Sequence, residues 1–173
     1  MTTANYVPSV TIDQVIDALT TFVQLILPTG QIVRGQQNRV ALPPDPCCVL
    51  TELLESDLNV PYGDYTPTNQ TAILNASTRI DVQVDFYGVL AGNYAKAFKS
   101  MFRSEWGWEQ FPDTVKPLYT DDGRKMPLIT GEQQYESRWT LTASMQYNPT
   151  VTVPQQSATA VGPTKINVPV NFT

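Results

Sequence analysis

Histidine is absent from this chain of 173 residues, and cysteine occurs only as the adjacent pair Cys47 and Cys48. Without histidine the chain has no Ser–His or Cys–His nucleophile–base pair and no imidazole metal ligand. Adjacent cysteines rarely form a disulfide with each other, and they lack the spacing of redox and zinc motifs. We interpret them as small apolar residues at the start of a strand. We expect no catalytic, cofactor-binding or metal-binding residues.

Charge is also scarce, because charged residues make up 16% of the chain against roughly 25% in a typical soluble domain. A surface rich in uncharged polar groups suits a protein that buries itself against copies or partners, although a β-rich composition is an equally simple explanation. The net charge is −5, and the eleven Lys and Arg are scattered, with no run longer than Arg124-Lys125. Specific nucleic-acid binding needs a clustered basic face. An acidic protein can still surround DNA without gripping it.

Long hydrophobic runs are missing too. The N-terminus has no basic region, and the apolar stretch that follows is interrupted by Asp13 and Asp17. No segment approaches the length of a transmembrane span. We therefore expect no membrane partner and a protein that is cytoplasmic where it is made.

Period-2 alternation of apolar and polar residues is the strongest pattern present, and it predicts strands. It is clearest in residues 79–87 and again in residues 135–147. The apolar sides of these two segments are Ile80, Val82, Val84 and Phe86, and Tyr135, Trp139, Leu141, Ala143, Met145 and Tyr147. We also expect strands at 32–42 and 47–55. The first of the alternating segments begins near residue 73, which makes a strand long enough to bend or to project beyond the body.

Two helices are expected. Thr11 and Gln14 match a capping box, and apolar residues recur at helical spacing from there to Ile26. A second helix follows Gly92-Asn93, and Gly107 is placed to cap its C-terminus. Its expected buried stripe is Tyr94, Ala97, Phe98, Met101 and Phe102. Trp106, Trp108 and Phe111 crowd its end, and we interpret them as core or interface residues.

The remaining segments are expected to be irregular: a leader at 1–10, a polar loop at 56–70, and a proline-spaced loop at 112–127. The fold class is therefore α+β, with a mixed, mainly antiparallel sheet, two helices packed on it and an extended C-terminal arm. We divide the chain into a domain of residues 1–148 and an arm of residues 149–173.

Within the arm, four apolar residues alternate with polar ones, and Pro169 restricts that stretch to an edge position in a sheet. The four are Ile166, Val168, Val170 and Phe172. An extended segment with one apolar face is the form that adds to the sheet edge of a neighbouring subunit. Folding back on its own domain and a disordered tail are the alternatives.

Paired carboxylates are the only candidates for chemistry. The pairs are Asp81 with Asp85, Asp121 with Asp122, and Glu132 with Glu136. Catalysis or metal binding would need them to converge with further groups at defined distances. We interpret each pair as part of a solvated face or as turn formers. The chain has no Walker motif and no dinucleotide fingerprint.

Several segments resemble the tailed-bacteriophage neck or tail-terminator family. The resemblance is carried by residues 79–88, 91–95, 117–122, 127–140 and 146–155, and less distinctly by the N-terminal helix and 47–55. It therefore covers most of the chain up to about residue 155. The stretch Ile129–Trp139 is the most distinctive part.

This resemblance implies a structural virion protein with no catalytic residues. It implies a homo-oligomeric ring, usually of six copies, that ends tube polymerisation at the head-proximal end of the tail. The implied partners are other copies, the tail tube protein, the sheath where the tail has one, and the neck or head-connector protein. DNA would pass through the lumen without specific binding. Assembly would take place in the cytoplasm of the bacterial host.

We expect the interfaces to lie on the 56–70 loop, the 112–127 loop and the C-terminal arm. The candidate interface residues are Tyr62, Tyr65, Trp108, Tyr119, Arg124, Ile166, Val168, Val170 and Phe172. One alternative is another neck or tube ring component, such as a head-completion or tail-tube-like protein. A remote alternative is a small carboxylate-dependent hydrolase that uses Asp81 or Glu132.

Overall fold

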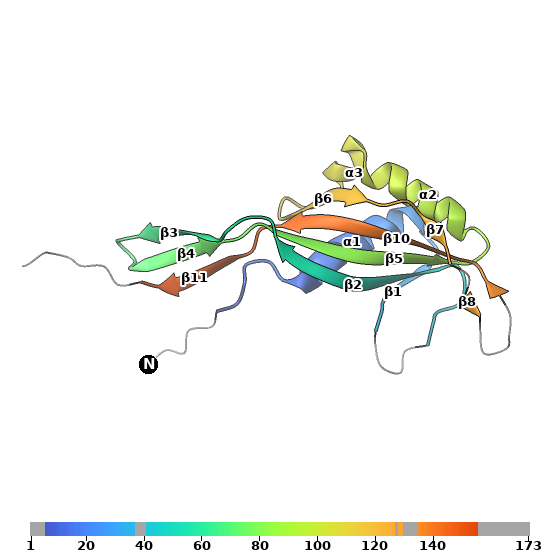
Figure 1. Cartoon of the computed structure of the whole chain (residues 1–173), viewed down its shortest axis with the longest axis horizontal. Helices are drawn as coiled ribbons and strands as arrows, with labels where there is room; N and C mark the ends of the chain where they lie inside the picture. The colour runs from blue at the N-terminus through green and yellow to red at the C-terminus, as the bar shows by residue number, and fades with distance from the viewer. Residues whose placement is uncertain (1–5, 37–40, 127, 130–134, 156–173) are drawn as a thin grey trace, which may run out of the picture.

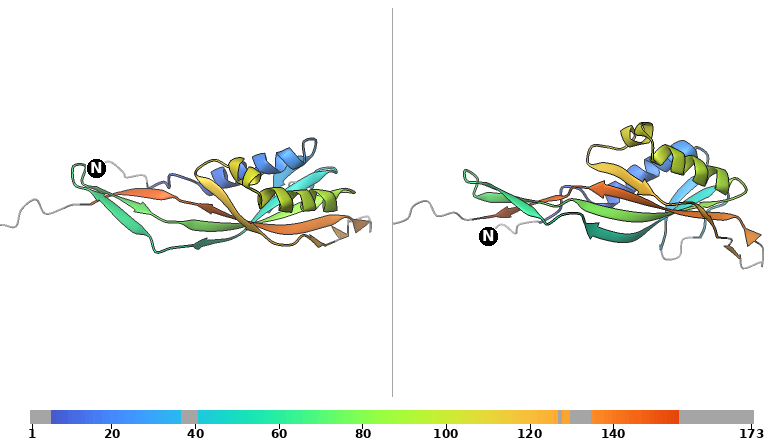
Figure 2. Two further views of the ribbon diagram at one scale, coloured as in Figure 1. Left: turned by 90° about the horizontal axis from the view of Figure 1, so that it is seen from above. Right: turned by 45° about the horizontal axis from the view of Figure 1, so that its top comes forward.

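The computed structural model describes residues 6–36, 41–126, 128–129 and 135–155 (Figure 1). It is an α+β protein with a mixed sheet of strand order β1-β2-β5-β10-β6, in which β7 also pairs with β10. Both long helices pack against one face of this main sheet, and a smaller three-stranded sheet projects from its end (Figure 2). Four of the candidate interface residues, Ile166, Val168, Val170 and Phe172, lie outside the described residues.

The N-terminal helix α1 (Ile12–Ile26) begins at the predicted capping box. The Thr11 N–H donates to Gln14 Oε1 at 2.9 Å, and the Gln14 N–H donates to Thr11 Oγ1 at 3.4 Å. This exchange satisfies two of the donors that a helix start leaves open. The helical spacing then turns one stripe into the core, formed by Val15, Ile16, Leu19, Phe22, Val23 and Ile26.

The second helix α2 (Ala91–Phe102) has the expected stripe, in which Phe98 and Phe102 are buried and Tyr94, Ala97 and Met101 pack half-buried against the core. The prediction for Gly107 was wrong. The C-cap residue of α2 is Arg103, and Gly107 lies inside a third, short helix α3 (Glu105–Glu109). Ser104 starts α3, because its Oγ accepts the Gly107 N–H at 3.0 Å. A Ser cap immediately after α2 therefore opens a new helix where the sequence pattern predicts an end.

The main sheet is held by the pairing of β5 (Thr78–Tyr87) with β10 (Arg138–Tyr147), which is antiparallel and unbroken from Thr78 opposite Tyr147 to Tyr87 opposite Arg138. β2 (Cys47–Asp57) is antiparallel to β5 on its other side, and β1 (Gln31–Arg34) is parallel to β2. As expected, Cys47 and Cys48 are buried free thiols at the start of a strand. The apolar sides of β5 and β10 face the helices and form the core.

Two expected irregular or extended segments differ in the structure. β1 ends at Arg34, well short of the predicted residue 42, and residues 37–40 lie outside the described part. The proline-spaced segment 112–127 contains strand β6 (Val115–Thr120) and the short β7 (Arg124–Lys125). β6 is the edge strand of the main sheet. Pro117 is tolerated there because no described strand on the outer side of β6 needs its backbone N–H. A short pair, β8 (Leu128–Ile129) and β9 (Tyr135–Glu136), precedes β10, so the predicted strand from Tyr135 is interrupted at Ser137.

The smaller sheet, which we call the finger, consists of β3 (Tyr62–Thr66), β4 (Thr71–Asn75) and β11 (Thr150–Pro154) in the order β11-β4-β3. It extends away from the helices (Figure 1). We predicted that the long strand from residue 73 would bend or would project beyond the body. It does both, because the strand is interrupted at Ala76-Ser77 and its first part projects as β4. The expected polar loop at 56–70 was wrong, since it contains the end of β2 and all of β3. The division of the chain at residue 148 stays a prediction.

Candidate interaction surfaces

The main-sheet face opposite the helices is polar, and two carboxylates dominate it. Asp85 on β5 accepts hydrogen bonds from Arg138 Nη2 at 2.7 Å, from Thr140 Oγ1 at 2.6 Å and from Gln83 Nε2 at 2.7 Å. Both oxygens of Asp85 are therefore occupied by donors, one from its own strand β5 and two from β10.

Asp81 is held in the same way four residues earlier on β5. Its oxygens accept from Arg79 Nε at 2.8 Å, from Arg79 Nη2 at 2.7 Å and from Ser144 Oγ at 2.5 Å. Burial by itself would raise the pKa of Asp81, but the hydrogen bonds from Arg79 and Ser144 and the positive charge of Arg79 lower it overall.

Our interpretation of this pair as a solvated face was wrong, because Asp81 is 8% exposed and Asp85 2% exposed. Alternation correctly turned both away from the helices, but arginine, serine and threonine side chains on the same face cover them. Each carboxylate is neutralised by an arginine, so neither is free to act as a base or nucleophile. Glu132, the other carboxylate named for a hydrolase, lies outside the described residues.

In the part of the chain that the structure describes, no three His, Cys, Asp or Glu side chains gather into a group able to hold a metal ion. The helices of that same part are too short or too polar to cross a bilayer.

A shallow cleft of about 340 Å³ lies between α2 and β10, beside Gly92, Lys96 and Trp139. It is open to solvent, and Lys99 on its rim is paired with Asp122.

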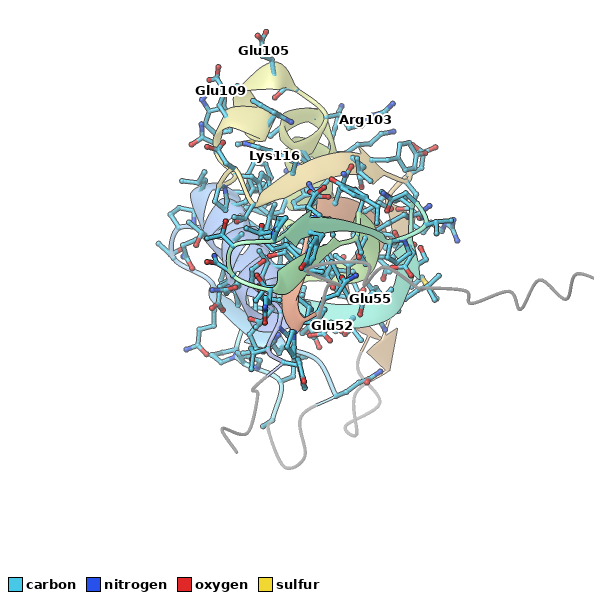
Figure 3. The ribbon with its side chains drawn as sticks, turned by 90° about the vertical axis from the view of Figure 1, so that its left-hand side faces the viewer. Glu52, Glu55, Arg103, Glu105, Glu109 and Lys116 are labelled. Atoms are coloured by element: carbon cyan, nitrogen blue, oxygen red, sulfur yellow. The ribbon has the colours of Figure 1, made fainter. Side chains whose placement is uncertain are left out.

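A patch of aromatic and cationic side chains lies on α3, β6 and the end of α2. The Lys116 ammonium lies 3.9 Å from the centre of the Trp108 ring, and the Arg103 guanidinium lies 5.4 Å from the centre of the Tyr119 ring. Trp108 and Tyr119 are about half exposed, and their role as interface residues stays a prediction. Figure 3 shows Arg103 and Lys116 on this part of the molecule, together with Glu105 and Glu109. We call it the aromatic–cation patch.

The other predicted interface residues separate in space. Arg124 on β7 is exposed and lies 3.5 Å from Asp121. Phe111, which the sequence groups with Trp106 and Trp108, is buried against Phe22 and Phe102. The aromatic cluster after α2 is therefore part core and part surface.

The finger and its base form a second surface. Tyr62 is exposed on β3, whereas Tyr65 is half-buried and its hydroxyl is buried without a hydrogen-bond partner among the described residues. Sequence reasoning missed the apolar side chains that are exposed on and around the finger. These are Leu53, Leu54, Leu58, Val60, Ile73 and Leu74. The adjacent leucines were the available signal, because in a strand one of two neighbours normally faces away from the core.

Charge differs sharply between these two surfaces. Residues 41–78 contain no lysine or arginine but include Glu52, Glu55, Asp57 and Asp64. Six of the eleven basic residues lie between Lys96 and Lys125, in the segment that includes the aromatic–cation patch. The segment that supplies two of the finger's strands is therefore acidic, and the patch contains exposed cations.

Comparison with known proteins supplies the identity. No curated protein matches the chain. A family model described as "Phage neck terminator protein" matches residues 13–168, which is nearly the whole chain and includes both long helices, the main sheet and the finger. The chain therefore belongs to the phage neck terminator protein family and is a structural component of the phage neck and tail.

Proposed function

We propose that this chain forms a closed ring of about six copies at the head-proximal end of a phage tail. The ring ends polymerisation of the tail tube and joins the tail to the neck or head connector. Family membership supports a location in the phage neck and tail. The finger is the structural observation that supports assembly into a ring. We propose no enzymatic activity, because Asp81, the described carboxylate of the hydrolase alternative, is bound by Arg79.

The finger needs a second surface. One of its faces carries Tyr65, Leu74, Val151 and Val153, and no helix among the described residues packs on it (Figure 2). The apolar face of a sheet is normally buried against a second layer, and the described residues supply no such layer here. Association with another subunit buries such a face.

The chain also offers two different surfaces, which favours a head-to-tail ring. A symmetric dimer joins one patch to itself, whereas a ring is closed by a heterologous interface between two unlike patches. The apolar finger with its acidic base and the aromatic–cation patch on the body are unlike in shape and charge. Tyr62, Trp108, Tyr119 and Arg124 are the exposed residues that we propose for these contacts.

The polar face of the main sheet supports passage of DNA through the ring. Its two described ion pairs, Arg79 with Asp81 and Arg138 with Asp85, leave it nearly balanced in charge. A lumen of this kind neither grips phosphates with free cations nor repels them strongly. We propose that the ring is assembled in the host cytoplasm and contacts the tube protein, the sheath where one is present, and the connector.

The test is the mass of the purified protein by light scattering, followed by negative-stain imaging of the same sample. We expect single rings of about six subunits with a central hole. Long open-ended stacks would instead support a tube-like component, which is the second candidate. A monomer that also fails to cap added tail tubes would contradict the proposal.

A further inference from the structure

The two outer edges of the finger are treated differently. On β11 the Ser9 N–H donates to the Thr150 carbonyl at 2.9 Å, and the Thr150 N–H donates to Ser9 Oγ at 3.0 Å. Pro154, at the end of the same edge, has no N–H to offer. On β3, no strand of the described residues pairs with the outer edge. That edge also lacks proline and lysine, the residues that commonly protect exposed edges.

The hydrogen-bond register shows which groups the open edge presents. Pro154 lies opposite Thr71, while the Gln155 N–H donates to the Gln70 carbonyl at 2.8 Å. In an antiparallel ladder this makes Pro154 and Thr71 a pair that is not hydrogen-bonded. Thr71 therefore directs its backbone groups away from β11 and toward β3, as do Ile73 and Asn75.

The same alternation continues across β3. The residues opposite Thr71, Ile73 and Asn75 direct their backbone groups back toward β4. These are Thr66, Asp64 and Tyr62. Gly63 and Tyr65 consequently direct their N–H and C=O groups outward, where they are free to pair with an added strand. Their side-chain positions lie on the apolar face of the finger, with Ala72 and Leu74.

The C-terminal sequence has the complementary pattern. Pro169 has no N–H, so in a strand added to an edge it must face away from the sheet. Its neighbours at alternate positions, Lys165, Asn167 and Asn171, then also face away. The N–H groups of the four apolar residues named above (166, 168, 170 and 172) all face the sheet. In an antiparallel addition such residues lie opposite Gly63 and Tyr65 and share their face, so their side chains extend the apolar face of the finger.

We propose that the segment Lys165–Thr173 of one copy adds as an antiparallel strand to the β3 edge of a neighbouring copy. This inference rests on the proposed ring and names the contact that links its subunits. β11 runs outward and ends at the finger tip, beside the β3–β4 turn (Figure 1). Residues 156–164 then provide up to about 30 Å of reach beyond that tip. The added strand places Lys165 on the same face as Asp64, which favours the pairing electrostatically.

Proline substitutions test whether the segment Lys165–Thr173 pairs with the β3 edge, because a proline removes an N–H group that faces either toward the sheet or away from it. In the full chain, Val168→Pro with Val170→Pro removes N–H groups that face the sheet in every register that pairs Gly63 and Tyr65. The matched control, Asn167→Pro with Asn171→Pro, adds the same number of prolines where the N–H groups face away. We expect the first double variant to raise the protein concentration needed for ring assembly at least about tenfold, and the control to assemble normally. Equal behaviour of the two would overturn the inference.

The acceptor edge is tested by Gly63→Pro, with Gly63→Ala as its control. Both add a Cβ that lies 3.3 Å from Leu74 Cδ2, but only proline removes the outward N–H. Thermal unfolding checks that both variants fold. We expect rings from the alanine variant and monomers from the proline variant. Rings from both would contradict the assignment of this edge.

Mixing separates exchange between copies from pairing within one chain. The Gly63→Pro chain keeps an intact segment, and the Val168→Pro, Val170→Pro chain keeps an intact edge. Equal amounts of the two should form a dimer of twice the chain mass, which neither forms alone. A monomeric mixture, beside wild-type rings, would mean pairing within a chain or a different occupant of the edge, and would overturn the inference while leaving the proposed ring. Absence of wild-type rings, even with tail tubes, would contradict the proposed function itself.

Discussion

Arg138 and Asp85 form an ion pair across the β5–β10 ladder, with 2.7 Å between Nη2 and Oδ2 and only 3% of the Asp85 side chain exposed. Burial by itself lowers the pKa of Arg138, but the hydrogen bond and charge of Asp85 raise it overall. The Arg138 guanidinium also lies 5.8 Å from the centre of the Tyr87 ring. A polar pair thus holds the end of the two central strands on the face that the helices leave uncovered.

Replacing Asp85 by alanine should destabilise the fold strongly. Arg138 would keep its charge in a largely buried position with no counter-charge, which costs about 3 kcal/mol. Urea unfolding measures the difference. Asp13→Asn is the control, because Asp13 is paired with Arg34 on the surface and its loss should cost under about 1 kcal/mol. Similar losses for the two variants would show that the burial of Asp85 does not matter.

The aromatic cluster under α1 predicts a second large effect. Phe22 contacts Phe98, Phe102 and Phe111 with ring centres 5.0–5.8 Å apart. Phe22→Ala should lower the free energy of unfolding by about 4 kcal/mol, through lost burial and a residual cavity. Leu25→Ala on the same helix is the control, since Leu25 is half exposed. A Phe22 variant no less stable than the Leu25 variant would place the core elsewhere.

Gly107 is required by a close backbone approach. A Cβ at this position would lie 1.9 Å from the Met101 carbonyl oxygen, so α3 cannot keep its place against α2. We expect Gly107→Ala to cost about 2 kcal/mol or more in thermal unfolding. At Gly123 the nearest atom to a new Cβ is 3.5 Å away, an ordinary contact. Gly123→Ala should therefore leave the melting temperature nearly unchanged.

Stability should fall at alkaline pH because of the two thiols. Burial, and secondarily the charge of Asp45, raises the pKa of Cys47 to about 11, and burial also raises the pKa of Cys48. A raised pKa in the folded state gives stability that is complete below the unfolded value of about 8.5. That stability is lost as pH rises toward 11. The free energy of unfolding, measured from pH 8 to about 11, should fall less in a Cys47→Ala, Cys48→Ala variant. Parallel curves would contradict the assignment to the thiols.

The aromatic–cation patch should affect assembly without affecting folding. Trp108→Ala removes the ring under Lys116 from an exposed site, so the melting temperature should change little. If the patch is one side of the ring interface, the concentration needed for assembly should rise about tenfold or more. Glu109→Gln on the same short helix is the control and should assemble normally. Normal rings from the Trp108 variant would remove this patch from the interface.

Several elements were predictable because their signals are local. The capping box at Thr11 and the apolar spacing to Ile26 specify α1 without reference to the rest of the chain. The alternation at Ile80 to Phe86 likewise specifies β5 and the face that it buries. The segments that carried the family resemblance lie mostly in such elements, and the family match confirms that reading.

Other features depended on which strands meet. Nothing in residues 56–70 alternates strongly enough to predict β3, which exists because β4 pairs with it and β11 completes the sheet. Asp81 reads as a solvated residue in a polar row, and only pairing with β10 brings Ser144 over it. Gly107 taken alone indicates the C-terminus of α2. The structure instead has an N-cap at Ser104, which starts α3 and places Gly107 inside that helix.

The amino-acid sequence alone specified the long helices, the central strands and the α+β class, because capping and side-chain period act over a few residues. Its lack of histidine also excluded histidine-based catalysis. The tertiary structure decided the finger, its edge at Gly63 and Tyr65 with which no described strand pairs, and the burial of the two carboxylates. These depend on pairing between segments far apart in the chain, and no local pattern records which backbone groups such pairing leaves free.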